Sequence, residues 1–172
     1  MSLLPVHRKF LVINQGIVST VFNFFLNGAI AWFLYHSVKQ VPLWGAFSVG
    51  ADTLITSIVL PSLTCLTVAL SVTFTITRGW MPALENFPKS GISGRFLRQS
   101  VLTQALIHGC AGVILFGIPA TAWFVYFGND GLSFEAFLRF KAIYAAALSL
   151  IFSPVIGFFA LYGSEPRRCR VL

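Results

Sequence analysis

GADTLITSIVLPSLTCLTVALSV, residues 50–72, sets one carboxylate at the start of a long apolar run. Residues 54–72 carry no charge, and Asp52 is the only acidic residue set within or against an apolar segment of the chain. A helix needs about 20 apolar residues to cross the hydrocarbon core of a bilayer. An unpaired charge in that core costs about 2.5–3.5 kcal/mol or more, so Asp52 needs a partner or water.

Three more apolar runs of similar length accompany this one; the four are residues 10–35, 52–75, 100–127 and 137–162. In lipid, only helices and closed barrels satisfy the backbone, and long runs without period-2 alternation indicate helices. The chain is 56% hydrophobic and only 10% charged, whereas a soluble domain is about 25% charged. The sequence therefore predicts an all-α polytopic membrane protein, with four transmembrane helices in a single membrane domain, residues 1–172.

Residues 41–51 are apolar too, but Pro42, Gly45 and Gly50 interrupt them. Joined to the second run they would make a helix of about 48 Å, too long for a core of about 30 Å. We therefore expect a turn or a short helix in the outer interface, with Asp52 near the outer end of the second helix.

Lysine and arginine predict the orientation. Nine of the 12 lie in the two tails and the middle loop, and three lie in the other two loops. By the positive-inside rule, both termini and the middle loop are cytoplasmic, N-in and C-in. The net charge of +7 follows this topology, so we expect anionic lipids at the cytoplasmic face and no nucleic acid as partners.

The sequence also contains a possible internal repeat. Residues 29–35, AIAWFLY, match residues 120–126, ATAWFVY, at five of seven positions. Chance similarity between apolar helices is the alternative. A true repeat predicts two similar hairpins, residues 10–77 and 99–163, related by a pseudo-two-fold axis along the membrane normal. It also brings Asp52 to the depth of Lys141, and so predicts an ion pair between them.

Several polar side chains share one side of a predicted helix. Gly16, Thr20, Asn23 and Asn27 are spaced 4, 3 and 4 along the first helix, which places them on one stripe. The second helix has a stripe of its own, made of Thr53, Thr56, Thr64, Thr67 and Ser71.

From these we predict an intramembrane polar cluster of Asn23, Asn27, Asp52, Thr56 and Lys141. Two explanations stay open: hydrogen bonding between packed helices, or a polar cavity that opens outward. Gln104 and His108, four residues apart beside Gly109 and Gly112, raise a similar choice. The histidine is either held by Gln104 or a backbone carbonyl, or part of a proton relay.

The sequence contains no phosphate-binding glycine loop, HExxH, GxSxG or paired metal-binding cysteines. We therefore expect no catalytic residue, no metal and no cofactor, and predict that the chain is not an enzyme.

The asparagine-bearing first helix, Pro42-Leu43-Trp44-Gly45, Gly50-Ala51-Asp52-Thr53 and Phe140-Lys141-Ala142 together form a recognisable set. They resemble a family of small four-helix bacterial membrane proteins labelled hypothetical or, in some cases, permease. The resemblance covers nearly the whole chain and implies the same four-helix membrane fold, in a bacterial inner membrane. It brings no established activity and no functional residues.

Two functions fit the sequence. The first is small-solute or ion transport, as a permease-like protein that forms a homo-oligomer, since four helices alone make a thin wall around a pore. The alternative is a non-transporting structural or accessory subunit that packs against a partner membrane subunit.

Overall fold

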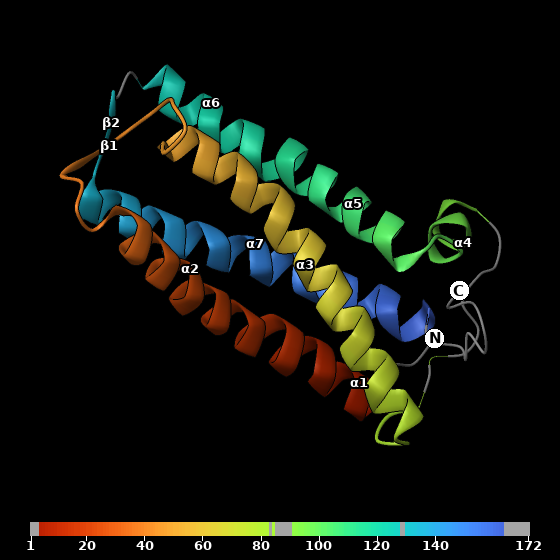
Figure 1. Ribbon diagram of the computed structural model, residues 1–172. Helices are drawn as coiled ribbons and strands as arrows, with labels where there is room; N and C mark the ends of the chain where they lie inside the picture. The colour runs from red at the N-terminus through yellow and green to blue at the C-terminus, as the bar shows by residue number, and fades with distance from the viewer. Residues whose placement is uncertain (1–3, 83, 85–90, 128–129, 164–172) are drawn as a thin grey trace.

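The computed structural model describes residues 4–82, 84, 91–127 and 130–163, and it is mostly helical (Figure 1). Four helices are long and apolar enough to span a membrane: Pro5–Tyr35, Val49–Thr77, Val101–Tyr126 and Phe134–Tyr162. By helix length and composition, the prediction of a membrane protein with four transmembrane helices is confirmed.

Within two of the spans the helix type changes. The first span consists of α1 (Pro5–Lys9), the π-helix η1 (Phe10–Val18) and α2 (Ser19–Tyr35). The second is α3 (Val49–Thr77), and a short helix, α4 (Ile92–Leu97), precedes the third. The third consists of α5 (Val101–Gly112), the π-helix η2 (Val113–Gly117) and α6 (Ile118–Tyr126), and the fourth is α7 (Phe134–Gly163). The two π-helices were not predicted from the sequence.

The C-terminal ends of the four helices match the predicted runs, but three of the helices begin at earlier residues than expected. The second begins at Val49 instead of residue 52 because Ser48 caps it, accepting a hydrogen bond from the backbone N–H of Ala51 at 3.2 Å. A serine at this position satisfies an N–H group that would otherwise have no partner in the helix. Asp52 consequently lies within the first turn of α3.

A short two-stranded ribbon, which the sequence did not predict, accompanies the helices. Strands β1 (Gln40–Pro42) and β2 (Gly131–Ser133) pair antiparallel, with Val41 opposite Leu132. The ribbon ties the two loops at the end of the molecule opposite α4 (Figure 1). The turn or short helix expected over residues 41–51 thus begins with strand residues. Strands of three residues are too short for period-2 alternation to reveal.

Packing does not follow chain order. α2 packs along α7, and α3 packs against both α7 and α5, whereas α2 and α3 make no extensive contact with each other. The molecule is therefore built from two packed helix pairs, α2 with α7 and α3 with α5, joined where α3 meets α7. Two buried apolar clusters fill it; one gathers around Leu60, Val72, Leu148 and Ile156, and the other lies beneath the ribbon around Tyr35, Val41 and Phe137.

Candidate functional site

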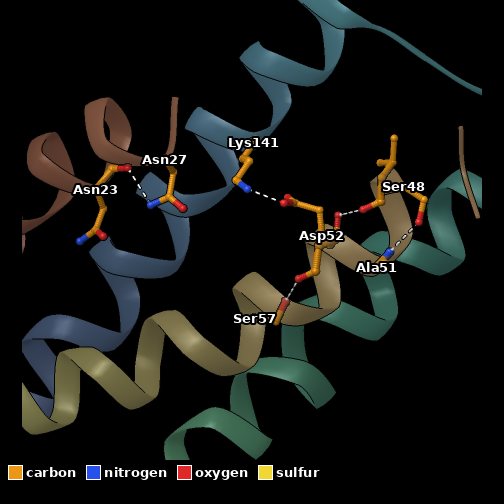
Figure 2. Close-up of polar contacts among 9 residues, drawn as sticks. Asn23, Asn27, Ser48, Ala51, Asp52, Ser57 and Lys141 are labelled. Atoms are coloured by element: carbon orange, nitrogen blue, oxygen red, sulfur yellow. Dashed lines mark hydrogen bonds and ion pairs between the residues drawn. The ribbon is translucent and has the colours of Figure 1, made fainter. Parts of the chain in front are cut away.

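An ion pair joins the two helix pairs near the ribbon. Lys141 of α7 donates to the carboxylate of Asp52 of α3 (Figure 2), and their side chains are only 5% and 13% exposed. The contact predicted from the possible repeat is therefore present. Because each charge neutralises the other, the ion pair offsets the free-energy cost of placing Asp52 beside an apolar run. Asp52 also gains from lying in the first turn of α3, where the helix dipole favours a negative charge.

Asn23 and Asn27 lie on α2 and turn toward α7. The amide of Asn27 donates to the backbone carbonyl of Asn23 at 3.0 Å. The amide of Asn23 donates to the carbonyl of Ser19 at 2.9 Å and to the hydroxyl of Ser149 at 3.1 Å. Figure 2 shows both asparagines on the other side of Lys141 from Asp52. The structure thus brings Asn23 and Asn27 together, but no hydrogen bond among the described residues links them to the ion pair.

Sequence reasoning missed a serine cluster at the α2–α7 interface. The hydroxyl of Ser19 lies 2.9 Å from those of Ser149 and Ser153, which are 3.1 Å from each other. Ser149 and Ser153 are fully buried. Their spacing of four residues in the fourth span was the available signal, because it places both hydroxyls on one side of the helix.

The predicted threonine stripe of α3 does not form one packed side. Thr53 and Thr56 are buried, whereas Thr67 and Ser71 are exposed. Thr67 bonds to its own helix, at the carbonyl of Leu63. Within the described residues, no hydrogen bond connects Thr56 to Asp52 or Lys141. The polar bridge from this part of α3 to α7 is instead made by Ser57, which lies 2.6 Å from the hydroxyl of Tyr144.

Gln104 and His108 hold helices together and have no side-chain link to each other. The amide of Gln104 donates to the carbonyls of Phe96 and Gln99, at 3.1 and 3.2 Å. His108 donates from Nδ1 to the carbonyl of Gln104 at 2.8 Å, since a carbonyl can only accept. Its ring stacks edgewise on Phe96, with 5.4 Å between centroids. Of the two open explanations, the histidine bonded to a backbone carbonyl is confirmed. The relay stays a prediction.

Glycines shape the α3–α5 interface, which here includes Gly117 of η2. A side chain on Gly112 would overlap the backbone carbonyl of Ser57, and one on Gly109 would meet Ser62 and Ile58. At Gly117 a Cβ would lie 2.8 Å from the hydroxyl oxygen of Ser57. The backbones of the two helices are therefore in direct contact, as small residues allow in membranes.

Within the parts of the chain that the structure describes, no group of three or more His, Cys, Asp or Glu side chains could hold a metal ion. No protein-family model, curated protein or solved structure matches the chain. The resemblance to the four-helix bacterial family stays a prediction.

Proposed function

We propose that this multi-pass membrane protein is a non-transporting structural or accessory subunit of a complex in a bacterial inner membrane. One observation carries the proposal: the asparagines that were candidates for a cavity lining are engaged in hydrogen bonds within the protein, and one of those bonds crosses between helices. Asn23 reaches Ser149 across the α2–α7 interface, and Asn27 bonds to the backbone of its own helix. In lipid such contacts stabilise helix pairs by roughly 0.6–2 kcal/mol each.

The bulk of the first span's surface also faces outward. Only 11% of its most apolar window is buried inside the chain, against 44% for the spans of α3 and α7. A subunit that acts through its packing surfaces needs such a face and needs no interior path.

Purification from native membranes tests this proposal. A tagged chain is extracted in mild detergent and analysed by mass spectrometry, with an unrelated tagged four-helix membrane protein as control. We expect a second membrane protein at fixed stoichiometry that is absent from the control. A chain recovered alone, or only with further copies of itself, would contradict the accessory role.

Small-solute or ion transport is the second candidate, and the ion pair favours it. Ionisable groups within membrane spans mark ion and solute pathways in many proteins. Asp52 and Lys141 bridge α3 and α7, where the two helix pairs join. A proton or cation that neutralised Asp52 would release Lys141 and loosen this junction.

Reconstituted liposomes test the transport candidate with dyes for H⁺, Na⁺ and K⁺ flux. Transport through this site predicts flux above that of empty liposomes, lost in Asp52→Asn and reduced in Asn27→Ala. Flux that survives both substitutions would exclude the site, and flux equal to empty liposomes would exclude transport of these ions.

We further propose that the end of the molecule bearing α4 is cytoplasmic and contacts anionic lipid headgroups. Its described basic residues are exposed, namely Arg8, Lys9, Arg78, Arg95 and Arg98. At the ribbon end Lys39 and Arg139 are exposed, while Lys141 is buried in its ion pair. Removing Lys141 from the loop count strengthens the positive-inside argument. Labelling of Arg95→Cys by a membrane-impermeant thiol reagent should require opened cells, and labelling of Lys39→Cys should not.

The internal repeat is also a proposal. It is supported by helix ends at Tyr35 and Tyr126, which are 91 residues apart, and by strands at the same offset. These strands pair with each other about Val41 and Leu132, as a two-fold axis would require. The packing of the first span on the fourth and of the third on the second has the same relation. An experimental structure whose halves fail to superpose would reject the repeat.

A further inference from the structure

One exposed amide in the first span has no hydrogen-bond partner among the residues that the structure describes. Asn14 lies in the π-helix η1 and is exposed, and its side chain makes no hydrogen bond to any residue that the structure describes. The adjacent Gln15 is buried and packs on Gly157 of α7. A Cβ added to Gly157 would lie 2.9 Å from the Cγ of Gln15. Farther along the same span, Asn23 and Asn27 are bonded. Asn14 is thus turned away from the protein.

When the first span is centred in a bilayer, the depth of Asn14 places this amide in hydrocarbon. It is six residues from residue 20, the midpoint of the span Pro5–Tyr35. At 1.5 Å per residue that is about 9 Å, within the roughly 15 Å that make up half of the core. Lipid tails offer neither a donor nor an acceptor at this depth. A side chain as short as asparagine does not reach the headgroups from there.

A second copy of the chain supplies what lipid lacks. We infer that the first spans of two copies pack against each other through Asn14, about a two-fold axis along the membrane normal. An asparagine amide carries both an N–H₂ donor and a carbonyl acceptor. Two copies of Asn14 facing each other across such an axis satisfy one another reciprocally.

The surface around Asn14 suits this contact. Val18, Val21 and Phe25 follow it at spacings of 4, 3 and 4, and they are 55%, 50% and 68% exposed. They form an apolar stripe on the same side of the helix. Such residues supply the van der Waals packing that accompanies polar contacts between membrane helices. The inference goes beyond the accessory role, because it concerns only contacts between identical chains.

Photobleaching step counts on the labelled full-length chain test the inference, in liposomes at a low ratio of protein to lipid. We expect mostly two-step traces for the wild type. Asn14→Leu should weaken dimerisation by about tenfold, and Asn14→Gln should largely preserve it. Ser71→Leu is the matched control, since it replaces an exposed polar residue on another helix and should leave the dimer unchanged.

A cysteine at position 14 gives a second readout in native membranes. With the native cysteines replaced by alanine, Asn14→Cys should form a disulfide-linked dimer on mild oxidation, and Ser71→Cys should not. Single-step traces for the wild type would overturn the inference, as would a dimer that Asn14→Leu leaves intact. Recovery of a different protein cross-linked at position 14, with the chain itself monomeric, would also overturn it. None of these results depends on whether an accessory partner is found.

Discussion

At the α2–α7 interface, three serine hydroxyls and an asparagine amide form a hydrogen-bonded cluster, whereas at the α3–α5 interface glycines bring two helix backbones into contact. Both interfaces face the same physical problem. Lipid tails are as apolar as leucine, so burying apolar surface between membrane helices gains little. One pair of helices is held by polar bonds and the other by close packing. We therefore expect the first to tolerate the loss of side-chain atoms and the second to reject their addition.

The junction between the two helix pairs should give the largest effect. Asp52→Ala removes the ion-pair partner of Lys141, whose side chain is only 5% exposed. Breaking a buried pair from one side costs about 3–5 kcal/mol, and we expect about 3 because Asp52 is 13% exposed. The measurement is the free energy of unfolding in mixed micelles, followed by tryptophan fluorescence. Glu135→Ala is the matched control: its pair with Arg139 is about 80% exposed and should contribute almost nothing.

The double variant Asp52→Ala with Lys141→Met sharpens this result. Because it removes both charges together, it should be less destabilised than the sum of the single changes. Additive losses would mean that the two side chains do not stabilise each other. The two helix pairs would then be held together by other contacts, such as that of Ser57 with Tyr144.

This ion pair and the C-terminal ends of the spans were within reach of sequence reasoning, because hydropathy defines the spans and the repeat offset of 91 residues carries Asp52 to within two residues of Lys141. Which helices pack against each other could not be predicted from the sequence. The stripe of Asn23 and Asn27 indicates that α2 packs through that side, but no feature of it identifies α7 instead of α3. The π-helices and the three-residue strands lack a periodic signal. Ser149 and Ser153 read as ordinary small residues until Ser19 is placed opposite them.

Gly112→Val should give the next largest effect, through the glycine interface. The added side chain would overlap the Ser57 carbonyl, which belongs to the backbone and cannot rotate away. We expect a loss at the upper end of the roughly 1–3 kcal/mol that overpacking costs. Cys110→Val, two residues away and exposed, is the control and should change the free energy of unfolding little. A Gly112→Val protein as stable as the control would show that the helices are not in backbone contact.

Removing a hydroxyl from the serine cluster should cost less. Ser149 contacts Ser19, Ser153 and Asn23, so Ser149→Ala should cost about 1 kcal/mol, within the range measured for such bonds. Ser153→Ala removes fewer contacts and should cost less than Ser149→Ala. Adding Asn23→Ala to Ser149→Ala should cost less than the sum, because both belong to one network. A loss from Ser149→Ala as large as that from Gly112→Val would remove the proposed difference between the interfaces.

The smallest change in the free energy of unfolding is expected at Thr67, on the exposed side of α3 that contributes to neither interface. Thr67 is exposed, and its hydroxyl donates to the carbonyl of Leu63, one turn back. Such back-bonding needs no partner helix and slightly weakens the helix itself. Thr67→Val should therefore leave the free energy of unfolding of the isolated chain within about 0.5 kcal/mol of the wild type. If native membranes protect the wild type but not Thr67→Val against unfolding, another protein covers this surface, because lipid cannot distinguish the two side chains so strongly. The same substitution thus separates a surface that faces lipid from one that another protein covers.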